Sequence, residues 1–122
     1  MDILTLGFDQ KRRTDLEEWI SECLEDAEIE ANIVNCGASP EVIVYNKPTQ
    51  PMISFIVIDR EDALHYAQIV ESWGEEYPIV MAATHPKYAI EGIRMKVKNY
   101  ILFPIEEKDI CESLKRTGVL RV

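Results

Sequence analysis

Short apolar runs alternate with segments of helical periodicity along the chain. The apolar runs predict strands at residues 3–8, 29–35, 52–59, 78–83 and 100–102. Apolar positions recurring every three or four residues predict helices at 11–27, 63–73, 86–97 and 106–116, and the helix-start signal Ser39-Pro40 predicts another at 39–46. Strict alternation of strand and helix predicts an α/β fold with a parallel sheet, helices on both faces and right-handed crossovers.

The run that ends at Asp59 is the most informative of these segments. Residues 54–58 are almost continuously apolar, which is typical of a central parallel strand covered on both faces. Parallel sheets of this kind place their functional residues outside the carboxyl ends of the strands. Asp59 stands at such an end, so its carboxylate is the first candidate functional group.

Length and composition predict one domain over residues 1–122. The chain is 47% hydrophobic and 29% charged, and no apolar run approaches the roughly 20 residues of a membrane span. A secretory signal is not expected either, so we expect a cytoplasmic protein without a membrane partner. The three cysteines form no CxxC motif and favour buried, reduced thiols, and His65 and His85 are isolated, so no metal site is predicted.

Charge is distributed unevenly along the chain. The net charge is −9, with a balance of −12 over residues 1–86 and +3 over residues 87–122. An acidic chain lacks the basic footprint that phosphate backbones require, so no nucleic-acid partner is expected for this domain itself. The basic excess near the C-terminus is either a solvated helix face or a docking face for an acidic partner.

Residues 88–105 carry the most specific signal. Tyr88-Ala89-Ile90-Glu91-Gly92-Ile93, followed by the segment Asn99 to Ile105, resembles the receiver domains of bacterial response regulators, above all those that precede LytTR-type DNA-binding domains. This resemblance implies a flavodoxin-like (CheY-like) three-layer sandwich. It further implies five parallel strands in the order 2-1-3-4-5 and five helices.

The resemblance makes Asp59 the phospho-acceptor of a receiver-like domain. The family's acidic pair, hydroxyl residue and lysine are replaced here by Gly7, Phe8, Ala83 and Phe103. Pro104 is retained, and the resemblance implies a cis bond before it. Phosphoryl transfer gathers several negative oxygens and needs a divalent ion and a fixed cation to offset them. These losses predict an atypical receiver that works by protein–protein interaction, without enzyme activity, metal or cofactor.

The main alternative is a working phospho-receiver with an unorthodox site. In that interpretation Asp9 and Asp59 bind Mg²⁺ within an acidic cluster that includes Glu61 and Asp62. The domain would then be the N-terminal part of a DNA-binding transcription regulator. A small-molecule binder on the same scaffold is a third, weaker alternative.

The resemblance also implies an interaction face. In receivers, the fourth helix, fifth strand and fifth helix commonly serve for homodimerisation or partner docking. Here that face would present Arg94, Lys98, Tyr100 and Lys108. Tyr100 takes the place of the family's aromatic switch residue, which moves with phosphorylation.

Overall fold

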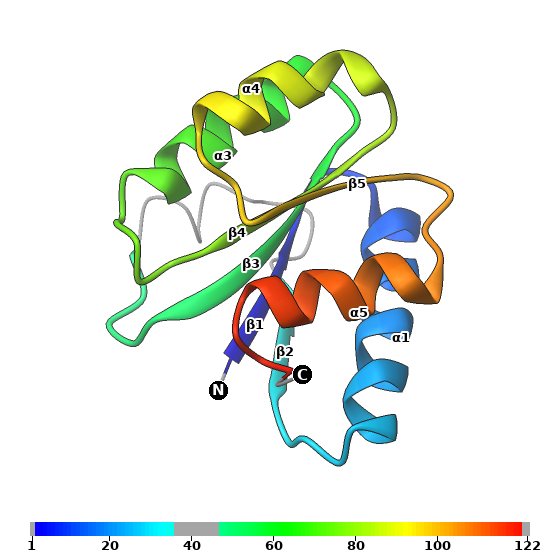
Figure 1. The fold of residues 1–122 in the computed structure, drawn as a ribbon. Helices are drawn as coiled ribbons and strands as arrows, with labels where there is room; N and C mark the ends of the chain where they lie inside the picture. The colour runs from blue at the N-terminus through cyan, green and yellow to red at the C-terminus, as the bar shows by residue number, and fades with distance from the viewer. Residues whose placement is uncertain (1, 36–46, 121–122) are drawn as a thin grey trace.

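Five parallel strands form a single sheet in the computed structural model, which describes residues 2–35 and 47–120. Their order across the sheet is β2-β1-β3-β4-β5, which confirms the predicted order (Figure 1). The strands are β1 Asp2–Leu6, β2 Asn32–Asn35, β3 Met52–Ile58, β4 Ile79–Ala83 and β5 Asn99–Leu102. Adjacent parallel strands place their carboxyl ends at one edge of the sheet.

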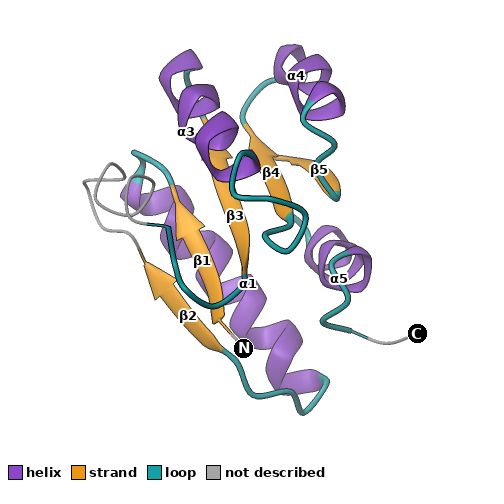
Figure 2. Cartoon of the chain, turned by 90° about the vertical axis from the view of Figure 1, so that its left-hand side faces the viewer, coloured by secondary structure: helices purple, strands orange, loops and turns teal. Residues whose placement is uncertain are grey.

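Helices cover both faces of this sheet (Figure 2). The described residues contain four α-helices and one turn of 3-10 helix: α1 Gln10–Asp26, α3 Glu61–Glu71, η1 Pro86–Tyr88, α4 Ala89–Arg94 and α5 Glu107–Arg116. The α1 and α5 helices pack on one face, while α3 and α4 pack on the other (Figure 1). The helix predicted at 39–46 lies outside the described residues. None of the described helices has the length and apolar character needed to cross a bilayer.

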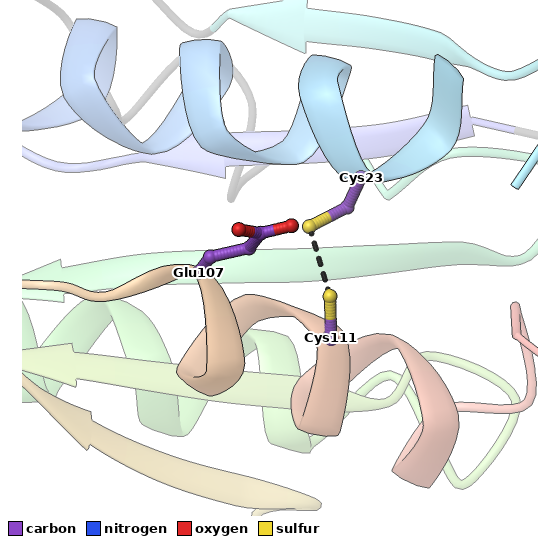
Figure 3. Close-up of side chains that lie close together, drawn as sticks. All are labelled: Cys23, Glu107 and Cys111. Carbon is purple, nitrogen blue, oxygen red and sulfur yellow. Dashed lines mark hydrogen bonds between the residues drawn. The ribbon is translucent and has the colours of Figure 1, made fainter. Parts of the chain in front are cut away.

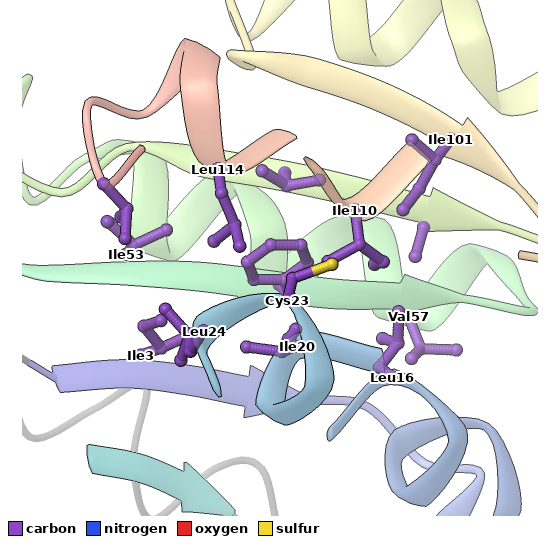
Figure 4. Packing of buried hydrophobic residues seen from close by; sticks show 14 residues of the cluster. Ile3, Leu16, Ile20, Cys23, Leu24, Ile53, Val57, Ile101, Ile110 and Leu114 are labelled. Carbon is purple, nitrogen blue, oxygen red and sulfur yellow. The ribbon is translucent and has the colours of Figure 1, made fainter. Parts of the chain in front are cut away.

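The central strand β3 is buried along its whole length, as its unbroken apolar sequence predicts. Because side chains alternate along a strand, Phe55 and Val57 join the core beneath α1 and α5, whereas Ile56 and Ile58 join the core beneath α3 and α4. On the α1 and α5 side, leucine and isoleucine side chains from both helices fill the space above the sheet (Figure 4). The two apolar layers hold the carboxyl edge of the sheet in place.

Two predicted boundaries, the end of α4 and the start of β2, are wrong, and each follows a helix cap with a left-handed residue. The α4 helix ends at Arg94 instead of residue 97, because Lys96 has a left-handed φ of 56° and Val97 donates its backbone N–H to Gly92 O at 3.1 Å. The α1 helix ends in the same way, with Glu28 at φ 57° and Ile29 bonded to Leu24 O at 2.9 Å. These are Schellman caps without the usual glycine, so their sequences give little warning. Because the cap of α1 includes Ile29, β2 begins at Asn32 and not at the predicted residue 29.

Candidate functional site at the carboxyl edge of the sheet

The sequence-predicted site positions lie at successive strand ends along one edge of the sheet. The register pairs Leu6 with Ile56, Ile58 with Ala83, and Ala83 with Leu102. The next residues of these strands therefore leave the sheet at the same edge, and they include Gly7 and Phe103 beside Asp59. Topology thus assembles the positions that the resemblance selects, although the residues at them are unusual.

Asp59 is half-buried at the end of β3. Its Oδ1 atom is buried and has no hydrogen-bond partner among the described residues. A buried carboxylate oxygen without a donor loses hydration that nothing replaces, at a typical cost of about 1–3 kcal/mol. Asp59 therefore has unmet acceptor capacity at this edge of the sheet.

Gly7 cannot be exchanged for an acidic residue without a collision. Its φ is 153°, and a Cβ atom built on it would lie 2.8 Å from the Cβ atom of Val57 on β3. Real Cβ atoms do not approach this closely, and the backbone conformation itself disfavours side chains. The close contact between the end of β1 and β3 thus excludes a carboxylate from the first acidic position.

Phe8 occupies the second acidic position and is held by aromatic and cationic neighbours. Its ring centroid lies 5.5 Å from that of Tyr66, with a tilt of 57°. The guanidinium of Arg60, the residue after Asp59, lies 3.6 Å from the centre of the Phe8 ring. This cation–π contact joins the ends of β1 and β3, where an acidic pair would hold a metal ion.

Asp9 is committed to the start of α1. Its carboxylate accepts the backbone N–H of Arg12 at 3.2 Å and forms an ion pair with the Arg12 guanidinium. These donors outweigh desolvation and hold the pKa of Asp9 below its ordinary value of 3.8. Asp9 is therefore an N-cap whose charge is already balanced.

The remaining members of the predicted acidic cluster stand apart from Asp9. Glu61 and Asp62 are exposed in the first turn of α3, where negative charge is favourable beside the helix N-terminus. No trio drawn from these residues, Asp9 and Asp59 is close enough to share an ion in the described part of the chain. The structure thus gives each of the three a local structural role.

Phe103 stands in place of the family's lysine. Its ring lies 5.5 Å from the Arg12 guanidinium, and its peptide bond to Pro104 is cis, as the resemblance implies. Ala83 is fully buried. The hydroxyl of the next residue, Thr84, lies 3.5 Å from the carbonyl oxygen of Ile58, a long contact that does not place it on Asp59.

A groove of about 570 Å³ opens at this edge beside α1. Its lining includes Asp9, Arg12, Trp19, Thr84 and Phe103, but not Asp59. The arginine that pairs with the N-cap Asp9 and the phenylalanine that replaces the lysine thus line the same hollow. The hollow therefore opens beside the acceptor position and not upon it.

On the predicted α4-β5-α5 face, two of the three basic side chains are paired with carboxylates. Arg94 pairs with Glu91 at 3.0 Å and Lys108 with Glu106 at 3.4 Å, so two of its predicted basic residues have partners on their own segments. The third, Lys98, is exposed just before β5 and lines a different hollow. This leaves less free positive charge on the face than the sequence suggests.

Apolar exposure is what sequence reasoning missed on this face. Ile90 is 61% exposed, Ile93 77% and Leu102 37%, and these are the large hydrophobic residues exposed in the described part of the chain. Ile90 and Ile93 are three residues apart in a helical segment that buries Tyr88, Gly92 and Met95 instead, and Leu102 ends β5. The elements of this face thus expose apolar side chains as well as charged ones.

Tyr100 on β5 is half-buried. Its hydroxyl donates to the backbone carbonyl of His85 at 2.8 Å, which ties β5 to the loop after β4. Desolvation, with a smaller contribution from Tyr88, raises the pKa of Tyr100. The ring is therefore held by a contact that does not involve Ala83 or Asp59.

A second group of potential ligands lies away from the sheet edge. Cys23 on α1 and Glu107 and Cys111 on α5 converge between the two helices (Figure 3). Cys23 is buried and Cys111 half-buried, both as free thiols, as predicted, while Cys36 lies outside the described residues. Sequence reasoning missed this trio because Cys23 and Cys111 are 88 positions apart.

Comparison with solved structures places the fold among receiver domains. A response-regulator receiver protein from Pseudoalteromonas atlantica is 16% identical, with 96% of each chain covered and a TM-score of 0.75. The response regulatory domain of MrkE from Klebsiella pneumoniae is 18% identical, covering 96% of this chain and 94% of its own, at a TM-score of 0.70.

A third similar structure is a candidate pilus assembly protein, CpaE, from Burkholderia thailandensis. It is 13% identical, covers 98% of this chain and 99% of its own, and has a TM-score of 0.73. No protein-family model matches the chain, and no curated protein matches it. At these identities the likeness establishes the flavodoxin-like receiver fold.

Proposed function

We propose that this chain is an atypical receiver-like signalling domain that acts by protein–protein interaction, without efficient phosphorylation of Asp59. The observation that carries the proposal is the contact between Arg60 and Phe8, with the guanidinium 3.6 Å from the ring centre. Phe8 stands at the position where the resemblance expects one residue of the metal-binding acidic pair, so this contact supports the proposal. We expect the domain to act in the cytoplasm.

The charge balance at the edge supports this proposal. Transfer of a phosphoryl group to Asp59 would need a divalent ion, and Mg²⁺ prefers several oxygen ligands in an octahedral arrangement. Gly7 and Phe8 provide no side-chain oxygen, and Asp9 is engaged with Arg12. Without the ion and the lysine, the added negative charge would stay uncompensated, which lowers the rate of transfer.

The interaction surface that we propose is the α4-β5-α5 face. Ile90, Ile93 and Leu102 are exposed apolar residues of its elements, and Arg94 and Lys98 are exposed basic ones. An apolar centre with a charged rim is the usual composition of a protein interface. The occupant is a protein partner or a second copy of the chain.

The second candidate function is phosphorylation of Asp59. It is favoured by one observation, the buried Oδ1 atom of Asp59 that has no hydrogen-bond partner among the described residues. An incoming Mg²⁺ ion held by Asp59 and Asp9 would satisfy this atom if Arg12 released Asp9. With the resemblance of residues 88–105 to receivers of LytTR-type regulators, the domain would then regulate transcription through an attached DNA-binding domain.

Incubation with Mg²⁺ and acetyl phosphate separates the two candidates. We expect no stoichiometric mass increase in the intact protein, and no change in tryptophan fluorescence when beryllofluoride is added. Asp59→Asn is the matched control, because it removes the acceptor oxygen and keeps the shape. A stoichiometric mass gain in the wild type that Asp59→Asn abolishes would establish the second candidate instead.

The interaction face is tested by hydrodynamic size. Arg94→Glu with Lys98→Glu reverses charge on the face, and we expect it to weaken self-association or partner binding as measured by sedimentation velocity. The control is Lys11→Glu with Lys47→Glu, which reverses the same amount of charge outside the face. Equal behaviour of the two double variants would count against the α4-β5-α5 surface.

A further inference from the structure

Three side chains with metal-binding atoms meet between α1 and α5. The Sγ atoms of Cys23 and Cys111 are 3.1 Å apart, and the ligand atoms of Cys23, Cys111 and Glu107 all lie within 4.8 Å of one another. Figure 3 shows Cys23 directed from α1 and the other two side chains from α5 toward the same point. In the described part of the chain no other His, Cys, Asp or Glu trio has this arrangement.

The fold fixes this arrangement. Glu107 and Cys111 are four residues apart on α5 and so share one side of the helix. Cys23 belongs to the buried face of α1, between Ile20 and Leu24, which packs against the sheet on the same side as α5 (Figure 4). Two packed helices therefore hold the sulfur ligands, so little conformational freedom remains to be lost on binding.

We propose that Cys23, Cys111 and Glu107 form a binding site for a thiophilic divalent cation, with Zn²⁺ as the reference ion. Zn²⁺ is bound by cysteine thiolates and carboxylates in tetrahedral geometry, and three protein ligands leave a fourth position for water. Two thiolates and one carboxylate balance the ion's charge with one negative charge in excess. Binding releases one proton from each thiol. The proposal is independent of the state of Asp59.

Size and access agree with this site. Two sulfurs that each lie about 2.3 Å from a tetrahedral zinc are roughly 3.8 Å apart, so the present 3.1 Å separation must widen by about 0.7 Å. A rotamer adjustment of Cys111, which is half-buried on the outer side, supplies such a shift. Cys23 is 3% exposed and closes the inner side, whereas Glu107 is exposed and leaves a route from solvent.

The chemistry favours a cation over a disulfide between the two cysteines. A divalent cation displaces the thiol proton and offsets the nearby carboxylate charge, whereas a disulfide has no use for Glu107.

The test is a titration of the reduced, metal-free full chain with Co²⁺ under anaerobic conditions. We expect sulfur-to-cobalt charge-transfer absorption in the near ultraviolet and visible d–d bands of tetrahedral intensity, with an endpoint at one ion per chain. Added Zn²⁺ should remove these bands by displacement. Absence of the charge-transfer band overturns the proposal, and so does a disulfide between Cys23 and Cys111 in a chain whose reduced form binds no Co²⁺.

Variants assign the ligands. Cys111→Ser removes one of the two thiolate ligands and should reduce the charge-transfer absorption at least about twofold. Glu107→Gln should weaken Zn²⁺ binding at least roughly tenfold, since even indirect ligand supports have effects of that size. Glu107 is exposed, so Glu107→Gln leaves the fold intact if a cysteine variant fails to fold. Glu112→Gln, an exposed carboxylate on the same helix, is the matched control and should bind as the wild type does. Equal affinity of Glu107→Gln and Glu112→Gln removes Glu107 from the site, and an unchanged band in Cys111→Ser overturns the proposal.

Discussion

The carboxyl edge of the sheet and the outer face of α4 and β5 differ in where their side chains find partners. At the edge, Arg60 lies on Phe8 and Asp9 pairs with Arg12, whereas the buried Oδ1 atom of Asp59 has no hydrogen-bond partner among the described residues. On the outer face, Ile90 and Ile93 are largely exposed and contribute little to the core. The edge thus combines internal pairing with one unmet acceptor, whereas the outer face leaves apolar side chains uncovered.

The energetics of the two regions point the same way. Full burial of one isoleucine side chain contributes about 1.5–3 kcal/mol. A partner that covers Ile90 and Ile93 would therefore gain a substantial part of its binding free energy from them. At the edge, by contrast, the Arg60 guanidinium already lies against the Phe8 ring. The following predictions test this contrast.

The largest expected effect belongs to Gly7→Asp, which attempts to restore an acidic residue at the edge. We expect a loss of about 3 kcal/mol in the free energy of unfolding, because the new Cβ atom would collide with Val57 in a backbone conformation that disfavours side chains. Chemical denaturation measures this loss. Gly74→Asp is the control, because Gly74 has a φ of 117° and nothing within 4 Å of a built Cβ atom. Equal losses in the two variants would show that the contact with Val57 does not matter.

The double variant Phe8→Asp, Phe103→Lys would make the edge more like that of a working receiver. It removes the ring under Arg60 and supplies both a carboxylate and a fixed cation near Asp59. We expect phosphoryl incorporation from acetyl phosphate in the presence of Mg²⁺ to rise about 10²-fold over the wild type, the usual size of one electrostatic contribution to such a step. Incorporation is measured by intact-protein mass.

The matched control for this reconstruction adds Asp59→Asn to the double variant, which should return incorporation to the background. A folded double variant that gains no phosphoryl group would mean that the two phenylalanines are not the cause of the deficiency. The missing carboxylate at Gly7, which neither change restores, would then be the remaining explanation for the lack of incorporation.

A smaller effect is expected from Ile90→Asp, Ile93→Asp on the outer face. The free energy of unfolding should change by no more than about 0.5 kcal/mol, because both side chains are exposed. Self-association or partner binding should weaken about tenfold or more if these residues form the centre of the interface. Denaturation and sedimentation velocity give the two numbers.

The control for the outer face is Gln10→Asp, Gln68→Asp, which adds the same charge at exposed positions of α1 and α3. A marked loss of stability in the isoleucine variant alone would show that Ile90 and Ile93 support the fold after all. Equal weakening of association by both variants would point to net charge instead of an apolar contact.

The smallest effect is expected from Asp9→Asn. Asparagine also caps helices, so the change removes charge and little else, at about 0.5 kcal/mol near neutral pH. Because the pKa of folded Asp9 is lowered, its contribution is present above the ordinary value of 3.8 and is lost as the pH falls through the folded-state pKa. The stability difference between wild type and variant should therefore shrink in acid, as followed by denaturation at several pH values. A difference that grows in acid would contradict the assignment.

Much of the fold could be predicted from periodicity and strand ends. The run 52–59 identified the central strand, and the structure gives β3 the range Met52–Ile58 with complete burial. The end of α4 and the start of β2 could not be predicted, because Lys96 and Glu28 adopt left-handed conformations that sequence preference assigns to glycine. The helix predicted at 39–46 stays a prediction.

The candidate site was predictable in its positions and less so in its contacts. Gly7, Phe8 and Phe103 were recognised as departures from the receiver pattern, and the structure adds the reason that Gly7 is fixed by Val57. The placement of Arg60 over Phe8 depends on tertiary packing, which local sequence patterns do not reveal. The same holds for the convergence of Cys23, Glu107 and Cys111. The exposed isoleucines were equally hidden, since an apolar residue in a helix is ordinarily taken to be core.

The hydrogen bond between the Tyr100 hydroxyl and the His85 carbonyl sets the population of any alternative ring position. A bond of this kind contributes about 1 kcal/mol net, which corresponds to roughly a fivefold preference for the observed rotamer when other terms are equal. A minority of molecules would then hold the ring elsewhere at equilibrium. A partner that contacts the loop after β4 would need only a modest difference in affinity between the two states to reverse this ratio, with no phosphoryl group involved.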